Sequence, residues 1–192
     1  MFCPAAMPRV CGCAINGIRF VCVGVECMVI IENNPLNTLL LEQMIKGPED
    51  LKLVWPMARY PFDHEQWGQV LDREKGAVSF LVYEGESLVG HAALDRTEEP
   101  QTRVVRFLYI IPELRGQGLG QKLMVLLEQY AREKLGARRL VLRVRNFNER
   151  AIGCYGKSGF FEFFRDGSLL MMEKDIGRGE TIDADKQNGS DF

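Results

Sequence analysis

The stretch "ELRGQGLGQKL", from Glu113 to Leu123, places three alternate glycines directly before a helical pattern. The residues before it, Arg103 to Pro112, are almost wholly apolar and predict a central strand that proline ends. The residues after it repeat apolar side chains at helical spacing as far as Gly136. Glycines between a strand and a helix let the backbone approach an anion, which the helix's free N–H groups and dipole attract. The sequence therefore predicts a phosphate-binding turn.

Two common phosphate loops fit this turn poorly. A nucleoside-triphosphate loop has Lys and then Ser or Thr after its last glycine, whereas Gln-Lys-Leu follows Gly120. A dinucleotide loop has the spacing GxGxxG and an acidic residue about 20 positions later. Here the spacing is GxGxG, and the next predicted strand ends with Arg143 and Arg145. We therefore expect a pyrophosphate that backbone amides hold without a metal.

A second motif, "NFNERAIGCYGKSGF", runs from Asn146 to Phe160. Together with "IIPELRGQGLG" (Ile110 to Gly120), it resembles the two signature motifs of the GNAT N-acetyltransferases. The first motif has an arginine before the glycines, and the second has the pattern Asn-x-x-Ala-x-x-x-Tyr followed by Gly-Phe. The matching residues of the second motif are Asn148, Ala151, Tyr155, Gly159 and Phe160. The resemblance covers roughly Leu51 to Ile176.

The resemblance implies transfer of an acetyl group from the co-substrate acetyl-CoA directly to an amine, without a metal. It implies that Tyr155 is catalytic and protonates the leaving thiolate, and that the N–H of Ile110 faces the thioester oxygen. It also implies a set of cofactor-binding residues along the pantetheine arm and at the pyrophosphate. These are Leu108, Tyr109, Ile110, Arg115, Gly116, Gln117, Gly118, Leu119, Gly120, Gln121, Asn148 and Tyr155.

The chain departs from the family pattern at the general base. Family members that act on protein N-termini often have a glutamate in the strand before Asn148, where this sequence has Arg143. This disfavours an N-terminal acceptor, and a cation there would favour an acceptor with a carboxylate or phosphate beside its amine. The remaining candidate bases are His64, Glu65, His91 and Asp95. We expect Cys154 to be a packing residue, since no histidine lies near it in sequence.

The hydrophobic periodicity predicts one α+β domain at residues 46–176. Its elements follow the order β, α, three antiparallel β strands, α, β, α, β, β. The first strand is placed at Glu49–Pro56, and Asp63 and Asn148 are candidate helix caps. Further strands are expected at Ala77–Tyr83, Leu88–Asp95 and 139–145, and the last hairpin turns at Asp166–Gly167. By the resemblance, the sheet is mixed, mostly antiparallel, flanked by helices and splayed at the acetyl-CoA site.

Both ends of the chain lie outside this domain. Residues 1–45 are expected to form an N-terminal extension, and residues 177–192 are polar and predict a disordered tail. The apolar stretch Ile18–Ile31 is shorter than the roughly 20 residues that a membrane span needs. Met28 and Met44 are plausible alternative translation starts.

The composition excludes several partners. The net charge of −2 and the lack of a basic block argue against nucleic acid, and no membrane partner is expected. Of six cysteines, Cys154 alone lies in the predicted domain, and Cys3, Cys11, Cys13, Cys22 and Cys27 precede it. Neither a disulfide framework nor paired zinc ligands result, so we expect a reduced, cytoplasmic protein.

The favoured function is an acetyl-CoA-dependent N-acetyltransferase that acts on an amine of a small molecule or peptide. Two alternatives stay open: a CoA-binding regulatory or sensor module without turnover, and a protein lysine acetyltransferase. Acceptor specificity is expected in the loop around Ala58–Trp67 and in the last hairpin. The apolar segments "FFEFF" and "LLMM" of that hairpin suit either a homodimer interface or core strands.

Overall fold

The computed structural model describes residues 14–15, 18–19, 21–22 and 27–177 of the chain. Residues 178–192 of the predicted tail lie outside this part, as do Cys3, Cys11 and Cys13. None of the helices in the described ranges is long and apolar enough to cross a membrane.

The core of the fold is an eight-stranded sheet in the order β3-β4-β5-β6-β7-β8-β10-β9. Its strands are β3 (Val21–Cys22), β4 (Cys27–Glu32), β5 (Val78–Glu84), β6 (Ser87–Arg96), β7 (Thr102–Ile110), β8 (Arg139–Arg145), β9 (Phe161–Asp166) and β10 (Leu169–Asp175). All neighbours are antiparallel except β7 and β8, which are parallel. A separate pair joins β1 (Ala14–Ile15) and β2 (Ile18–Arg19). The expected mixed, mostly antiparallel α+β architecture is confirmed.

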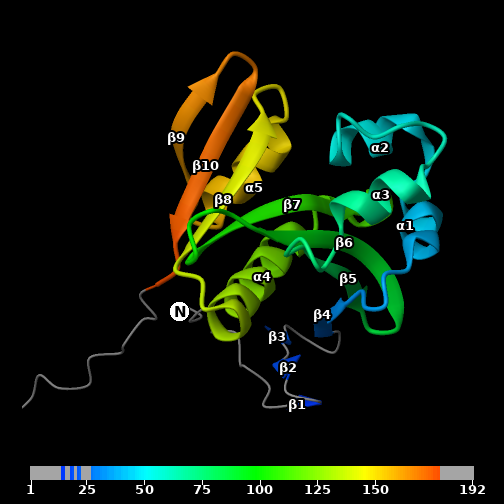
Figure 1. Ribbon diagram of the computed structural model, residues 1–192, viewed down its shortest axis with the longest axis horizontal. Helices are drawn as coiled ribbons and strands as arrows, with labels where there is room; N and C mark the ends of the chain where they lie inside the picture. The colour runs from blue at the N-terminus through cyan, green and yellow to red at the C-terminus, as the bar shows by residue number, and fades with distance from the viewer. Residues whose placement is uncertain (1–13, 16–17, 20, 23–26, 178–192) are drawn as a thin grey trace, which may run out of the picture.

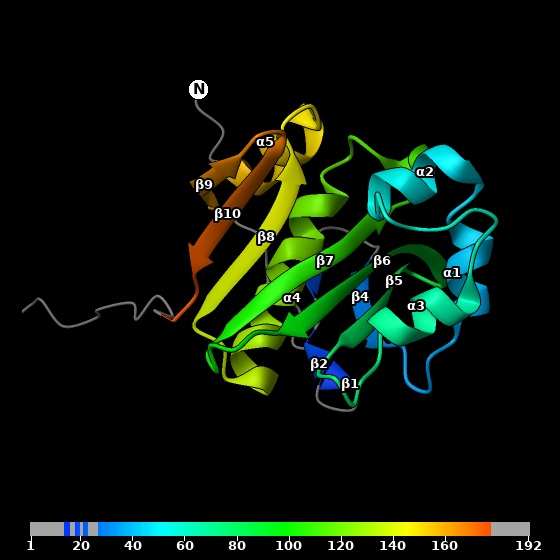
Figure 2. The same ribbon diagram turned by 45° about the horizontal axis from the view of Figure 1, so that its top comes forward.

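Helices cover the two faces of the sheet unequally (Figures 1 and 2). One hydrophobic cluster packs α4 (Leu119–Leu135) and α5 (Glu149–Lys157) on one face. A second packs α1 (Thr38–Met44), α2 (Gly47–Val54) and α3 (His64–Val70) on the other face, over β5, β6 and β7. Within the described part of the chain, no helix covers β8, β10 and β9 on this second side, which we call the open face.

Local sequence signals predicted most element ends correctly. The Asp63 side chain accepts a hydrogen bond from Gln66 N–H at the start of α3, and the Asn148 side chain accepts one from Ala151 N–H at the start of α5. Gly136 ends α4 in the left-handed conformation. The last hairpin turns at Gly167, where φ is 53°. Each of these positions was identified from residue type and spacing alone.

The predicted strand at Glu49–Pro56 is wrong, because these residues lie largely in helix α2. Pro48 at the start of α2 and the acidic Glu49 and Asp50 in its first turn favour a helix N-terminus. The sheet instead gains β4, which pairs with β5, and α1 buries Leu41 and Met44. Both β4 and α1 therefore pack with the sheet although they precede residue 46.

Candidate active site

The parallel strands β7 and β8 are paired along only half of their length. The pairs run from Thr102–Arg139 to Val105–Leu142, and the strands then diverge (Figure 1). Residues 106–110 of β7 therefore have no strand partner on the β8 side within residues 27–177. We call the gap that they border the split.

A β-bulge changes β7 where the split begins. The register to β6 shifts between His91 and Ala93, so that β7 carries an extra residue. Phe107 has a φ of 52°, which is a strained conformation for a residue with a side chain. The Trp55 and Trp67 rings pack on Phe107, with centroids 5.4 and 5.1 Å from its ring. The aromatic packing fixes the bulge from the α1–α3 side.

His91 holds the bulge through buried hydrogen bonds. Its Nδ1 lies 3.2 Å from the carbonyl oxygen of Phe107, and its Nε2 lies 2.9 Å from Ser79 Oγ. A carbonyl can only accept, so Nδ1 carries the proton and Nε2 accepts from the hydroxyl. Burial lowers the pKa of His91 to about 4, although the hydrogen bond to Phe107 opposes this shift. His91, a candidate base from sequence, is thus a neutral, fully buried residue that fixes backbone.

The backbone of β7 presents a free donor to the split. Ile111 N–H donates to Val89 O at 3.0 Å, so residue 111 faces β6. Backbone groups of successive strand residues point to opposite edges, so Ile110 faces the split and Tyr109 faces β6. The Ile110 carbonyl accepts from Arg115 Nε at 2.8 Å. The Ile110 N–H points into the split and has no partner among the described residues.

The glycine turn, residues 115–120, lies between β7 and α4. Gly116 and Gly118 have φ of 91° and 81°, and Gly118 caps α4. Within the described residues, the N–H groups of residues 116–120 donate to no backbone acceptor. A cluster of free donors at a helix N-terminus has the chemistry that attracts an anion. A Cβ on Gly120 would lie 3.0 Å from Cys154 Sγ, so a glycine here lets α4 and α5 approach.

Cys154 fills this contact between the two helices. Its pKa is raised, because burial disfavours the thiolate. The expectation that Cys154 is a packing residue agrees with this environment.

The Arg115 side chain is committed to protein contacts rather than to the turn. Its Nη2 lies 2.9 Å from Asp50 Oδ1, and its guanidinium lies 5.1 Å from the centre of the Tyr109 ring. The Tyr109 hydroxyl donates to Asp50 Oδ2 at 2.8 Å, and burial together with this bond raises the pKa of Tyr109. Asp50 therefore ties α2 to the end of β7, a contact that sequence reasoning missed.

Arg150 is a second residue that sequence reasoning missed. It lies exposed in the first turn of α5, and its Nη2 would be 3.4 Å from a Cβ on Gly116. It therefore places a positive charge beside the glycine turn. Arg150 lies within the second motif. If the two motifs are assumed to lie side by side in the fold, this position indicates a residue near the glycine turn.

Tyr155 lies on α5 among the core residues next to α4. Its ring centroid is 6.3 Å from that of Phe160, and its hydroxyl forms no hydrogen bond with any residue in 27–177. Burial raises the pKa of Tyr155, so the phenol stays protonated at neutral pH. It is thus a proton donor without a protein partner.

The other candidate bases lie on the opposite side of the sheet. Asp95 forms an ion pair with Arg106, and its Oδ1 is buried with no hydrogen-bond partner among the described residues. His64 contacts Thr38 Oγ1 at 2.9 Å and Glu42 at 3.3 Å. Glu65 accepts from Gln69 at 3.3 Å. Of these groups, Asp95 alone adjoins a residue of the split.

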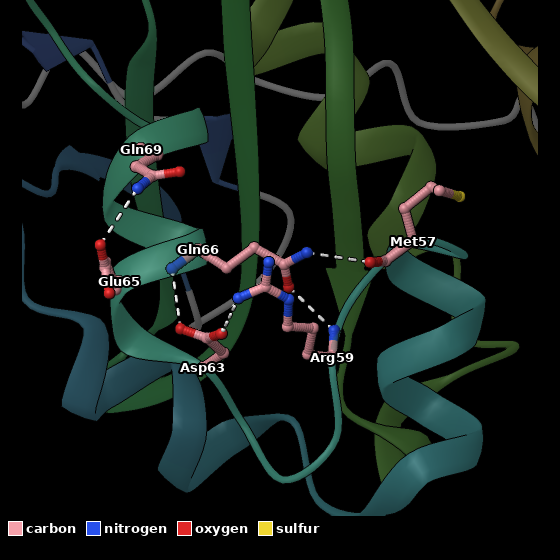
Figure 3. Close-up of polar contacts among 6 residues, drawn as sticks. All are labelled: Met57, Arg59, Asp63, Glu65, Gln66 and Gln69. Carbon is pink, nitrogen blue, oxygen red and sulfur yellow. Dashed lines mark hydrogen bonds and ion pairs between the residues drawn. The ribbon is translucent and has the colours of Figure 1, made fainter.

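The loop between α2 and α3 is fixed by side chains of α3 (Figure 3). Gln66 accepts from the backbone N–H of Arg59 at 2.8 Å and donates to the carbonyl of Met57 at 3.0 Å. Asp63 accepts from Gln66 N–H and from Arg59 Nη1, each at 2.9 Å. These hydrogen bonds attach the loop that was expected to influence acceptor choice to the start of α3.

Comparisons with known proteins agree with this geometry. The profile of the "Acetyltransferase (GNAT) family" matches residues 42–160. A comparison of the sequence with curated proteins gives no match. Among similar solved structures is the spermidine N-acetyltransferase of Vibrio cholerae in complex with CoA and spermine. It is 17% identical, covers 78% of this chain and 95% of its own, and has a TM-score of 0.63.

Two further structures have the same fold. The N-acetyltransferase PseH of Campylobacter jejuni, in complex with acetyl coenzyme A, is 22% identical, covers 77% of this chain and 98% of its own, and has a TM-score of 0.60. An aminoglycoside acetyltransferase in complex with coenzyme A is 17% identical, covers 77% and 94%, and has a TM-score of 0.65. At these identities the likeness concerns the fold.

Proposed function

The chain belongs to the GNAT acetyltransferase family, and we propose that it transfers the acetyl group of acetyl-CoA directly to an amine of a small molecule or peptide. The observation that carries this proposal is the split, because it leads from the free Ile110 N–H to the free amides of residues 116–120. The PseH structure in complex with acetyl coenzyme A has the same fold, which supports a CoA site here.

The cofactor would lie along the split. Backbone groups of Leu108 and Ile110 would pair with the pantetheine arm as a further strand does, because they face the β8 side. The amides of the glycine turn would bind the pyrophosphate, and Arg150 would add a positive charge. Asn148 and Arg115 would act indirectly, through the cap of α5 and the Asp50 contact.

Direct transfer forms a C–N bond and breaks the C–S bond of the thioester. The Ile110 N–H would stabilise the negative charge that develops on the thioester oxygen. Tyr155 would donate its proton to the leaving sulfur, since its phenol is protonated and without a partner. The amine must lose a proton. Asp95 lies opposite Val104, six residues before Ile110, so its unpartnered oxygen would receive this proton through a chain of waters rather than directly.

The test measures acetyl-CoA binding and thiol release separately, with a panel of amines and mass spectrometry of the products. Binding with acetylated small amines supports the proposal, and binding without turnover favours a CoA-binding regulatory module. Acetylation confined to lysine side chains of proteins favours the lysine alternative. Replacement of Arg150 by Gln should weaken acetyl-CoA binding about tenfold, whereas Arg132→Gln on the last turn of α4 should not change it.

Two properties from sequence stay predictions. A homodimer through the last hairpin draws support from Phe161, Phe163 and Phe164, which are 55%, 42% and 53% exposed. Light scattering of the purified protein decides between a dimer and a monomer. The reduced, cytoplasmic location is tested by fractionation of cells that express the full chain.

A further inference from the structure

We propose that the amine acceptor carries a carboxylate or phosphate group beside its amine, and that Arg143 binds this anion. The inference rests on the proposed acetyl transfer and assigns the chemical class of its acceptor. It depends on where two arginines lie relative to the split.

Arg106 and Arg143 stand on either side of the entrance to the split. The last pair of the parallel ladder joins Val105 to Leu142, so each arginine is the first residue beyond it on its strand. Leu142 and Val144 lie in the core with α4, and side chains alternate along a strand. Arg143 therefore lies on the open face, away from α4. Arg106 lies on the same side, where it contacts Asp95 and the Phe107 ring.

The charges at this entrance do not cancel. Arg106 is paired with Asp95, whereas Arg143 is exposed and its side chain makes no ion pair or hydrogen bond with another residue of the described part. Arg145, two positions further, donates to the neutral Ser168 hydroxyl at 2.8 Å. Glu173, two positions past Met171 on β10, is already paired with Arg139. An acceptor that approaches over the open face thus meets a net positive charge, which attracts an anion and repels a polycation.

The surface next to Arg143 is apolar. Val104 and Val141 pair across the ladder on the same side, one step below the two arginines, and Met171 lies opposite Arg143 on β10. A guanidinium binds a carboxylate or phosphate with two parallel hydrogen bonds, and the valines suit an apolar group. An amino acid with an aromatic or aliphatic side chain carries all three groups: an amine, an anion and an apolar group. This class differs from spermidine and aminoglycosides, the polyamines that the similar structures' names indicate.

The experiment compares amines that differ in charge. L-Phenylalanine and phenethylamine differ by the carboxylate, β-alanine and 2-aminoethyl phosphate differ in the kind of anion, and spermidine is a polycation. For each, kcat/KM is measured from thiol release at saturating acetyl-CoA and corrected for the fraction of unprotonated amine. Binding to the CoA complex is measured in parallel by calorimetry. We expect anionic amines to have a higher kcat/KM than phenethylamine and spermidine and to bind the CoA complex more tightly. The comparison of β-alanine with 2-aminoethyl phosphate distinguishes a carboxylate from a phosphate preference.

Variants of Arg143 assign the effect to this residue. Arg143→Gln should lower kcat/KM for anionic amines about 10- to 100-fold and leave phenethylamine within about twofold, as expected for loss of one charged hydrogen-bonded contact. Arg143→Lys should restore part of the loss because it keeps the charge. Arg143→Glu should reverse the preference towards spermidine. Arg132→Gln, on the opposite face, is the matched control.

The outcomes separate the two proposals. Binding of acetyl-CoA without thiol release for any amine contradicts acetyl transfer, and calorimetry then still decides whether anions bind. Equal or stronger binding of phenethylamine or spermidine overturns the anionic acceptor, even where transfer occurs. A preference for anions that Arg143→Glu leaves unchanged overturns the role of Arg143.

Discussion

The lower and upper halves of β7 contrast within a single strand. From Arg103 to Val105, β7 is paired on both edges, with β6 and with β8. From Arg106 to Ile110, it is paired with β6 alone and contains the bulge at Phe107. Backbone groups without partners are costly when they are removed from water, so a strand edge of this kind is suited to a ligand that pairs with it. The candidate site is therefore built from backbone groups of β7 that the sheet leaves unpaired.

The contact between β6 and the upper half of β7 is the most sensitive part of this contrast. A Cβ on Gly90 would lie 2.4 Å from the carbonyl oxygen of Tyr109 and 2.9 Å from Ile110 Cδ1. Gly90→Ala must therefore move the backbone of β7, and we expect the free energy of unfolding to fall by about 4 kcal/mol. Urea unfolding followed by circular dichroism measures this change.

A glycine with open space provides the control. Gly68 lies inside α3 and would have nothing within 4 Å of an added Cβ. Gly68→Ala should raise the free energy of unfolding by about 0.5–1 kcal/mol through helix propensity. If the two variants were equally stable, the close approach of β6 to β7 would not hold.

The buried His91, which bonds to the upper half of β7, makes the free energy of unfolding depend on pH. The unfolded imidazole takes up a proton below its pKa of 6.5, whereas the folded one does so at about 4. Unfolding thus takes up a proton between these values, and stability present above pH 6.5 is lost as the pH falls towards 4. The loss should be about 3 kcal/mol, since one unit of pKa corresponds to about 1.4 kcal/mol.

Variants isolate this contribution from the carboxylates that titrate in the same range. The difference in unfolding free energy between wild type and His91→Gln should narrow as the pH falls from 7 to 4. His64→Gln removes the other of the two histidines, which is exposed, and is the matched substitution for comparison. If the unfolding free energies of wild type and His91→Gln fell in parallel between pH 7 and 4, His91 would not be a neutral, buried imidazole.

The same contrast separates what the sequence could predict from what it could not. The glycine turn, α4 and the caps at Asp63 and Asn148 were predictable because residues close in sequence determine them. Residues 49–56 predict a strand that Pro56 ends, but Pro48 directly before them is the signal of a helix N-terminus.

Contacts between residues of different elements could not be predicted from the spacing of residues in the sequence. The Asp50–Arg115 pair and the hydrogen bonds of His91 join residues from different elements, and their partners depend on strand register. A single sequence carries no information on which residues face one another across the sheet. For this reason the sequence suggests His91 as a candidate base, whereas in the structure its hydrogen bonds to Ser79 and Phe107 hold the backbone in place.

A chemical comparison tests whether the split is the place of reaction. Tyr155→Phe removes the proton donor but keeps the packed ring, so kcat should fall about 100-fold while KM for acetyl-CoA stays within about twofold. Tyr83→Phe removes a hydroxyl on β5, two strands away from β7 in the sheet, and should leave both constants unchanged. Steady-state kinetics of thiol release measures the effect. A fall in acetyl-CoA binding with unchanged kcat would assign Tyr155 to packing instead.

The smallest effect concerns the α2–α3 loop, which side chains rather than strand pairing hold in place (Figure 3). Gln66 bonds to both sides of this loop, at Met57 O and Arg59 N. Gln66→Ala should lower the free energy of unfolding by about 1 kcal/mol, because exposed hydrogen bonds contribute little each. If the loop borders the acceptor, KM for the amine should also rise while KM for acetyl-CoA does not.

Gln69 lies one turn further along the same helix and supplies the matched control. Its side chain bonds only to Glu65, at 3.3 Å, within the described residues (Figure 3). Gln69→Ala should therefore change the free energy of unfolding by less than about 0.5 kcal/mol and leave both KM values as they are. A rise in the amine KM for both variants would mean that α3 as a whole influences the acceptor. A rise for Gln66→Ala alone would identify the fixed loop as the part that the acceptor contacts, because the two glutamines differ chiefly in that contact.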